Sequence, residues 1–289
     1  MENDSTLNMK LQYLRNKSWE EIGLLPEVEE IESMLTMSER KLLLTIAKDY
    51  YSGEGVIIDG GCFLGGSTIS ICAGLIENQN FNIFSKPLVH SYDRFLVEPW
   101  AEGRNFSSSY TKMDLNNTSN EYQKRKPGDS FRDLFDINLT PYKTLLCVHE
   151  GDITKEPIIE GKIEILFLDI LKGKKVCDFV TENYYRKMIP GRSLLIHQDY
   201  LFSGFNFHIH VTMELLEEYF TIVTNCECNS VVYIYDKEIP ENFDLHDLYM
   251  RLNASEKEHY MDKAISRWEG KQREIMLKAK ESMRAQGEI

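Results

Sequence analysis

The stretch from Val56 to Thr68 reads Val-Ile-Ile-Asp-Gly-Gly-Cys-Phe-Leu-Gly-Gly-Ser-Thr and predicts the class of fold. Three β-branched residues lead into an acid and a glycine-rich turn, and a helix is expected from Ser67 to about Asn78. Glycines allow a positive φ and let a ligand approach the backbone closely. The free N–H groups at the helix start, with Ser67 as a candidate N-cap, favour an electron-rich ligand. The stretch therefore predicts a buried strand, a tight binding loop and a helix N-terminus.

Two common glycine loops do not fit this stretch. A phosphate loop needs Gly-Lys-Ser/Thr at its end, and no lysine is present; the Gly-x-Gly-x-x-Gly of a dinucleotide loop lacks its first glycine. The stretch instead has Asp59 followed by Gly61 and Gly65. A carboxylate at the strand end repels a pyrophosphate and suits a cationic or amino-bearing ligand. A glycine-rich turn that binds nothing stays open as the alternative.

The composition describes an acidic chain with a real hydrophobic core. Of the 289 residues 42% are hydrophobic, and 33 Lys and Arg stand against 46 Asp and Glu, a net charge of −13. Without a basic stretch, such a chain is not expected to bind nucleic acid or an anionic membrane. No apolar run approaches the ~20 residues of a transmembrane helix. The polar N-terminus, Met1 to Ser5, does not read as a signal peptide.

The cysteines indicate a reducing compartment. They are scattered, make no zinc-binding pattern and are expected to be reduced and mostly buried, which predicts a cytoplasmic location. The six are Cys62, Cys72, Cys147, Cys177, Cys226 and Cys228.

Along the chain, strands alternate with helices, which predicts an α/β fold with a doubly wound, mostly parallel sheet. Two close strands near the end predict an antiparallel edge. We expect a helical N-terminal cap over residues 1–50, an α/β domain over residues 51–240 and a helical C-terminal extension over residues 241–289. An irregular insertion, about residues 98–140, is expected to form a substrate-side element.

The C-terminal segment, Ser255 to Ile289, carries apolar residues at helical spacing and predicts one helix with a narrow seam. Two interpretations stay open for this helix. It packs on its own domain, or it forms a homodimer interface.

Acids recur where predicted strands end, and parallel sheets bind ligands at those ends. Asp93 follows Asp59 by 34 residues, more than the usual gap of about 20 for a ribose-binding acid. An acid on a surface turn is the alternative for any one of them. The strand-end acids are Asp59, Asp93, Asp152, Asp169 and Asp199.

Over about residues 40–236, the glycine loop and these acids resemble the class I S-adenosylmethionine (SAM) methyltransferases, whose first motif is Asp/Glu-x-Gly-x-x-x-Gly. The resemblance implies a Rossmann-like fold and SAM as cofactor. Asp59 and the glycines would hold its methionine end, Asp93 its ribose hydroxyls and Asp152 its adenine amine. The cofactor-binding residues implied are Asp59, Gly61, Gly65, Ser67, Asp93, Arg94, Asp152, Ile153 and Asp169.

The fourth and fifth predicted strands are similar to those of metal-dependent small-molecule O-methyltransferases of the catechol and macrocin types. The catechol type has a lysine base three residues after the acid that ends strand four, and Asp169 and Lys172 repeat that step. The resemblance implies a Mg²⁺ site formed by Asp169, Gln198 and Asp199. Glutamine is a weaker ligand than carboxylate for a hard cation, which puts the metal in doubt.

The candidate proton acceptors are Lys172, His197 and the metal-side Asp169. His197 follows strand five, and its pKa lies near neutrality when unperturbed. His208 and His210 are further candidates. On the extended stretch expected here they would share a face, so a weak metal site formed by the pair is another interpretation. For any one histidine, a hydrogen-bonded structural role is the alternative, and Lys172 could equally belong to a solvated lysine cluster.

The sequence therefore predicts a SAM-dependent O-methyltransferase acting on a small polar or sugar-containing substrate. Two alternatives stay open. One is a catalytically degenerate methyltransferase fold that binds SAM or a partner, and the other is an NAD-dependent oxidoreductase.

Overall fold

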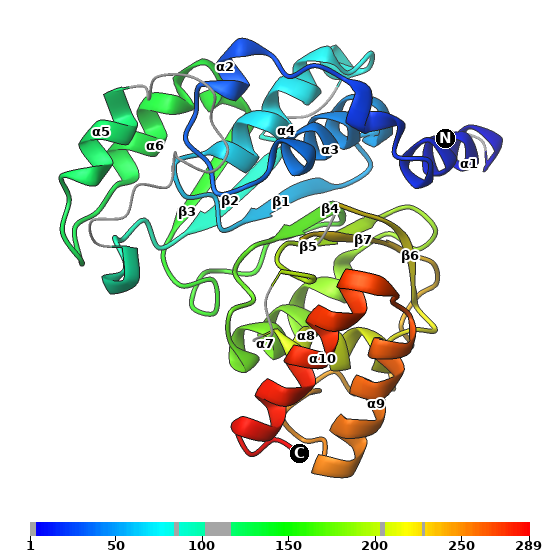
Figure 1. Cartoon of the computed structure of the whole chain (residues 1–289). Helices are drawn as coiled ribbons and strands as arrows, with labels where there is room; N and C mark the ends of the chain where they lie inside the picture. The colour runs from blue at the N-terminus through cyan, green and yellow to red at the C-terminus, as the bar shows by residue number, and fades with distance from the viewer. Residues whose placement is uncertain (1–3, 84–86, 102–116, 203–205, 227–228) are drawn as a thin grey trace. The chain divides into compact units, whose positions relative to one another are not determined.

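The computed structural model describes residues 4–83, 87–101, 117–202, 206–226 and 229–289 (Figure 1). The chain divides into two compact units, Met1–Glu156 and Pro157–Ile289. Each unit is described by itself below. The predicted boundaries near residues 50 and 240 stay predictions, and part of the predicted substrate-side element, residues 102–116, lies outside the described residues.

Three parallel strands form the sheet of the first unit. They are β1 (Val56–Gly60), β2 (Val89–Asp93) and β3 (Leu146–Glu150), in the order β3-β2-β1. Gly60 pairs with Tyr92, and Asp93 pairs with Glu150, so the three carboxyl ends meet at one edge. Two backbone bonds extend the ladder into the following loops: Gly61 N–H to Tyr92 O at 2.8 Å and Gly151 N–H to Asp93 O at 2.9 Å. The strand-end acids of this unit are thereby gathered at one edge.

Helices cover much of the rest of the first unit, and the predicted helical N-terminal segment is confirmed. Helix α3 begins with a capping box between Thr36 and Glu39. It packs against α4, where a Cβ on Gly74 would lie 2.3 Å from Leu44 O, so only glycine allows this close approach. The elements are α1 (Asp4–Arg15), η1 (Ser18–Glu21), α2 (Pro26–Glu29), α3 (Met37–Thr45), η2 (Ile46–Tyr50), α4 (Gly66–Glu77), η3 (Phe81–Ile83), η4 (Pro99–Ala101), α5 (Asn117–Gln123), α6 (Arg132–Asn138) and η6 (Thr140–Leu145).

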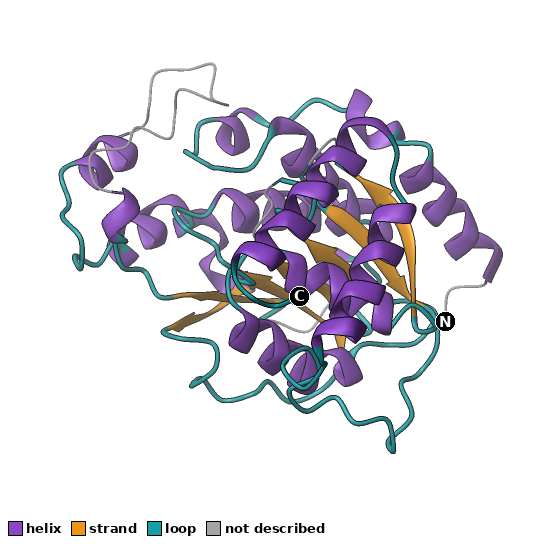
Figure 2. Ribbon diagram, turned by 60° about the horizontal axis from the view of Figure 1, so that its bottom comes forward, coloured by secondary structure: helices purple, strands orange, loops and turns teal. Residues whose placement is uncertain are grey.

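Four strands form the sheet of the second unit, in the order β4-β5-β7-β6. They are β4 (Ile163–Leu168), β5 (Leu194–His197), β6 (Phe220–Asn225) and β7 (Val231–Tyr235). Strands β4 and β5 are parallel, whereas β7 is antiparallel to both β5 and β6. The predicted α/β class, with a mostly parallel sheet and an antiparallel edge, is confirmed. Figure 2 shows the strands flanked by helices.

The C-terminal segment corrects one prediction. The single helix expected from Ser255 to Ile289 is two helices, α9 (Ala254–Ser266) and α10 (Gly270–Ala285), which lie side by side (Figure 1). The chain turns between them at Gly270, whose φ is +51°. Both helices also contact α8 (Phe207–Leu215), and α7 (Lys174–Tyr184) and η7 (Tyr185–Lys187) complete the helices of this unit. Among the residues described, no helix combines the length and apolarity needed to cross a membrane.

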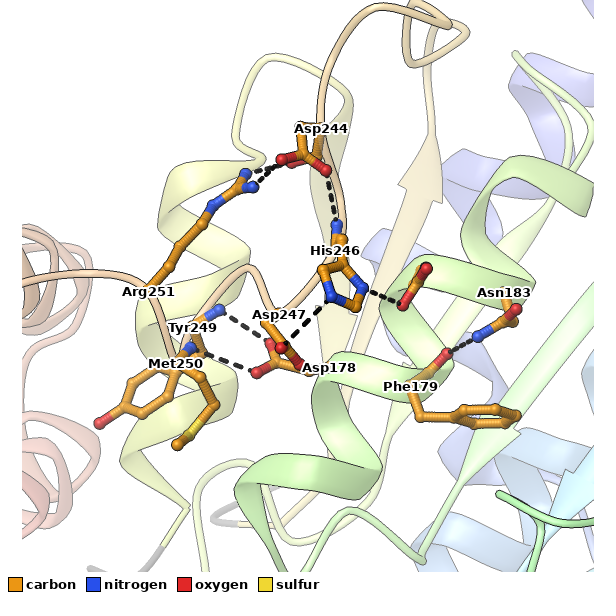
Figure 3. Close-up of polar contacts among 10 residues, drawn as sticks. Asp178, Phe179, Asn183, Asp244, His246, Asp247, Tyr249, Met250 and Arg251 are labelled. Carbon is orange, nitrogen blue, oxygen red and sulfur yellow. Dashed lines mark hydrogen bonds and ion pairs between the residues drawn. The ribbon is translucent and has the colours of Figure 1, made fainter.

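A buried carboxylate fastens the segment before α9 onto α7 (Figure 3). Asp178 accepts hydrogen bonds from the backbone N–H groups of Tyr249 at 2.8 Å and Met250 at 3.2 Å. Burial raises the pKa of Asp178, while the two backbone bonds lower it and offset part of that rise. Around it, His246 contacts Glu182, and Asp244 forms an ion pair with Arg251 (Figure 3). The Asp178 bonds are therefore the buried part of this attachment.

Replacing Asp178 tests that attachment. In Asp178→Asn an amide N–H₂ faces one of the two backbone donors, and a buried donor then lacks its acceptor. We expect the free energy of unfolding to fall by ~1–3 kcal/mol, as measured by chemical denaturation. Asp236→Asn, an exposed position in the same unit, should leave it unchanged. Equal stability of Asp178→Asn and the parent chain would contradict the assignment.

Candidate functional site

Asp59 lies at the end of β1 and is completely buried. Its Oδ2 accepts hydrogen bonds from Thr68 Oγ1 at 2.5 Å and from Ser67 Oγ at 3.1 Å, both on the first turn of α4. Its Oδ1 has no hydrogen-bond partner among the described residues. Burial raises the pKa of Asp59 to about 6, although the two hydroxyl donors lower it. A carboxylate with one buried oxygen left over suits an amino or ammonium group of a ligand.

The glycine loop after β1 takes the backbone conformation that the sequence predicts. Gly61 and Gly65 have φ values of +91° and +100°. A Cβ at Gly65 would lie 2.2 Å from Leu139 Cδ2, and one at Gly66 would lie 2.4 Å from Ser33 Cβ. One detail corrects the sequence prediction: Gly65 is the N-cap of α4, and Ser67 directs its hydroxyl to Asp59 rather than capping the helix.

Asp93, at the end of β2, is held against the same loop. Its Oδ2 accepts the Phe63 N–H at 2.9 Å, and its Oδ1 accepts the Phe95 N–H at 2.8 Å. Burial raises the pKa of Asp93, and these backbone bonds act against the rise. Each carboxylate oxygen can accept a further hydrogen bond. The geometry is therefore compatible with a diol at Asp93, as predicted for a ribose.

Aromatic side chains pack around Phe63, whose backbone N–H binds Asp93, and sequence reasoning missed them. The Phe63 ring has edge contacts with Tyr122 at 4.9 Å and Phe131 at 5.6 Å between centroids. Phe63 itself has a φ of +48°, which is rare for an aromatic residue. Backbone strain of this kind gathers at binding sites. An unusual aromatic residue inside a glycine loop was the only signal that the sequence offered.

The remaining residues of the first unit that were predicted to bind the cofactor are either more exposed than Asp59 or have contacts within the protein. Asp152 Oδ1 accepts from the Thr154 N–H at 3.0 Å and hydroxyl at 2.9 Å, and the Thr154 backbone bond in particular lowers the pKa of Asp152. Ile153 is buried, and the exposed Arg94 forms an ion pair with Glu98 at 2.8 Å. The Asp152 carboxylate binds Thr154 within its own loop and is still half-exposed, so its predicted adenine contact stays a prediction.

In the second unit, the three predicted metal ligands converge on a lysine. Lys172 Nζ lies 2.6 Å from Asp169 Oδ1 and 3.3 Å from Gln198 Oε1, and it also forms an ion pair with Asp199. Asp199 has a φ of +59° and accepts a bond from Gln198 Nε2 at 2.7 Å. The oxygen donors meet as a cation site requires, but the cation between them is the ammonium of Lys172. In this arrangement the residues do not fit a Mg²⁺ ion.

The same contacts decide the protonation of Lys172. Burial lowers the pKa of the ammonium, but the carboxylates of Asp169 and Asp199 outweigh that effect, and the pKa is raised overall. A lysine so held keeps its proton at neutral pH. As a proton acceptor it would first have to leave both carboxylates.

His197 lies on β5 and is completely buried. Its Nε2 is 3.1 Å from the Tyr185 hydroxyl, and aromatic rings of Tyr200 and Tyr233 also contact it. Burial, with smaller contributions from His210 and His208, lowers the pKa of His197 to about 3. An imidazole with that pKa is a weak base, so the structure favours the alternative of a structural histidine.

His208 and His210 correct another prediction. They lie on α8, not on an extended stretch, so they do not share a face as alternate strand residues would. His208 Nε2 is 2.9 Å from Leu171 O, and His210 Nε2 is 2.7 Å from Tyr200 O. Both bonds are to backbone carbonyls. These histidines therefore hold loops in place and do not form a metal-binding pair.

The fold is similar to that of an O-methyltransferase of known structure. The NovP O-methyltransferase superposes with a TM-score of 0.52 at 13% identity, covering 80% of this chain and 98% of NovP. The calicheamicin methyltransferase CalS11 gives 0.46 at 13% identity over 82% and 95% of the two chains. A caffeoyl-CoA O-methyltransferase candidate from Staphylococcus aureus gives 0.45 at 14% identity over 78% and 99%. No protein-family model and no curated protein matches the sequence. The resemblance inferred from the sequence is thus confirmed for the fold.

The buried charge of Asp59 makes a testable difference to stability. Its pKa of about 6 lies above the ordinary value of about 3.9, so the folded chain binds more protons than the unfolded chain between these values. The ionised carboxylate therefore costs on the order of 2–3 kcal/mol above pH 6 and nothing below pH 4. Asp59→Asn should be more stable than the parent chain at pH 7, by denaturant unfolding, and the difference should vanish near pH 4. The exposed Asp136→Asn should show no such pH dependence. A loss of stability at both pH values would contradict the assignment.

Removing the Lys172 ammonium should open the oxygen cluster to a metal. In Lys172→Met, Asp169 and Asp199 lose their cation and repel one another, and a hard divalent cation relieves that repulsion. We expect calorimetric titration to detect Mg²⁺ binding in Lys172→Met and none in the parent chain. Lys175→Met, an exposed neighbour, should behave as the parent chain. Equal Mg²⁺ binding by parent and Lys172→Met would show that the ammonium does not occupy the site.

Proposed function

We propose that the chain is a SAM-dependent methyltransferase that transfers the methyl group to a hydroxyl oxygen of a small polar or sugar-containing substrate. The cofactor is assigned to the first unit, at the carboxyl ends of β1 and β2.

The observation that carries the proposal is the buried carboxylate of Asp59 beside the glycine loop. Its Oδ1, which has no hydrogen-bond partner among the described residues, matches the ammonium of the methionine part of SAM, which would provide both a donor and a positive charge. Asp93, fixed by the N–H groups of Phe63 and Phe95, offers its remaining acceptor capacity to the two ribose hydroxyls. A pyrophosphate would be repelled by this pair of acids, which disfavours a dinucleotide.

The fold supports the same conclusion. NovP, which superposes with a TM-score of 0.52, is an O-methyltransferase. At 13% identity the likeness covers the fold alone. Oxygen as the acceptor atom is therefore proposed here by analogy with NovP.

The chemistry demanded of the residues is limited. The sulfonium of SAM supplies an electrophilic methyl group, and the protein has to place the hydroxyl in line with it and accept its proton. The group that accepts the proton is left unassigned, because Lys172 holds its own proton and His197 is a weak base. His197 is left with a structural role because of its low pKa.

A second candidate function is a SAM-binding protein without turnover. It is favoured by one observation: His197 has a pKa of about 3 and Lys172 is protonated, so two of the three predicted proton acceptors are unsuited to that role. Cofactor binding would then be retained because Asp59 and Asp93 do not depend on a base.

Calorimetric titration with SAM and with S-adenosylhomocysteine tests the cofactor. We expect binding of both, and a loss of about 1–3 kcal/mol in Asp93→Ala because the ribose contact is removed. Glu27→Ala, an exposed acid of the same unit, should bind like the parent chain, and NAD should give no heat. Absence of SAM binding, or equal binding by Asp93→Ala, would overturn the cofactor assignment.

Turnover separates the two candidates. The methyl group of labelled SAM should pass to a hydroxylated acceptor from a panel of sugars and small phenols, with S-adenosylhomocysteine as the second product. Asp93→Ala should lower transfer at subsaturating SAM, because it binds the cofactor less tightly. SAM binding without transfer to any acceptor would favour the non-catalytic candidate.

A further inference from the structure

Three metal-ligating side chains to which no role is assigned above lie together on neighbouring strands of the first unit. His90 is on β2, and Cys147 and His149 are on β3. His90 pairs with Cys147 in the parallel register, and Tyr92 pairs with His149. Side chains two residues apart on a strand share a face, so the three ligands occupy the same face of the sheet.

The distances among these side chains are close to those of a metal site. His90 Nδ1 lies 3.0 Å from His149 Nε2. One ligand atom of each of the three residues lies within 4.8 Å of the others, and all three are half-buried. The rings are also held in place, because His149 stacks on Tyr92 at 4.1 Å between centroids with an interplanar angle of 6°. The site is therefore assembled and rigid without a metal.

The protonation of the two imidazoles also favours metal binding. Burial, with a smaller contribution from His149, lowers the pKa of His90 to about 4. Burial likewise lowers the pKa of His149, against a rise caused by the charge of Glu156. Both rings are neutral at physiological pH, which is the form that binds a metal. The negative charge of Glu156 near His149 adds attraction for a cation.

We propose that His90, Cys147 and His149 form a binding site for a borderline-soft divalent metal ion, with Zn²⁺ as the reference ion. Zinc binds imidazole nitrogen at about 2.0–2.1 Å in a tetrahedron, which places two such nitrogens roughly 3.3 Å apart. The observed separation of 3.0 Å needs a change of only a few tenths of an ångström. Two imidazoles and a thiolate are ligands that zinc prefers and that Mg²⁺ does not.

The protons balance as follows when the ion binds. The Cys147 thiol loses its proton to solvent, and the thiolate binds the metal. The proton shared between His90 Nδ1 and His149 Nε2 moves away, so that each ring carries its proton on the other nitrogen. Three protein ligands leave a fourth position for water.

The site would cross-link β2 and β3 directly beside Asp93, which ends β2. Its existence does not depend on the proposed methyl transfer. The expectation that the cysteines make no zinc pattern rested on spacing along the chain, and here the pairing of two strands brings together residues 57 positions apart, His90 and Cys147.

Cobalt substitution on the full chain tests this inference. After treatment with EDTA, one equivalent of Co²⁺ should produce the near-ultraviolet absorption of a thiolate–cobalt bond, and one equivalent of Zn²⁺ should abolish it. The Asp169 and Asp199 cluster offers no sulfur, so any ion bound there would be silent in this band. Zn²⁺ should also raise the thermal unfolding midpoint of the chain.

Variants identify the ligands. Cys147→Ala should lose the thiolate band, and His149→Gln should weaken Zn²⁺ binding at least tenfold in competition with a chromophoric chelator. Cys177→Ala and His259→Ala, which lie in the second unit, are the matched controls and should behave as the parent chain. Circular dichroism checks the fold of each variant. If a variant fails to fold, the cobalt band of the parent chain still tests the proposal. No band in the parent chain, or a band that survives in Cys147→Ala, would overturn the proposal. Failure of SAM binding or turnover would leave it unaffected.

Discussion

The hydrogen bonds from Ser67 and Thr68 to the buried carboxylate of Asp59 are the constraint on which the first unit depends. A charge inside a protein is costly unless donors face it, and here both donors come from the first turn of α4. The end of β1 and the start of α4 are thereby fixed to each other. The loop between them has to be short and tightly turned, which explains the positive φ of Gly61 and Gly65. The other carboxylate oxygen, Oδ1, has no hydrogen-bond partner among the described residues, and it can accept a hydrogen bond from a ligand at the strand end.

The sequence was sufficient for the sheet and for the position of the acids, because both follow from local pattern. β-branched runs predict buried strands, and strands that alternate with helices predict parallel pairing. Parallel strands end at one edge, so Asp59 and Asp93 had to lie near one another, and the register of β1 and β2 shows that they do. The glycine conformations were predictable for the same reason, since a turn that links a strand directly to a helix requires them.

What the sequence could not supply was the partner of each polar side chain. Lys172, proposed as a base, instead neutralises Asp169 and Asp199, because three residues that follow two separate strands converge only in the folded unit. His197 follows the apolar residues of β5 into the interior and loses its basicity there by desolvation. Thr68 and Phe63 were overlooked because their roles depend on contacts with Asp59 and Asp93. The break at Gly270 was visible in the sequence, but the apolar spacing across it suggested a continuous helix.

The polar clusters described here differ in the cations they suit, and the difference follows from their donors. The Asp169 and Asp199 oxygens carry enough negative charge to bind a hard metal. A lysine of the same chain already supplies the positive charge that such a metal would bring, without the entropy cost of binding a separate ion. The His90, Cys147 and His149 cluster presents imidazole nitrogen and sulfur, which discriminate in favour of softer metals. Asp59 presents a single free oxygen in a buried setting, too few ligands for any metal and enough for one ammonium. Because each cluster excludes the cation that another accepts, an organic cofactor and a metal could occupy this chain together without competing.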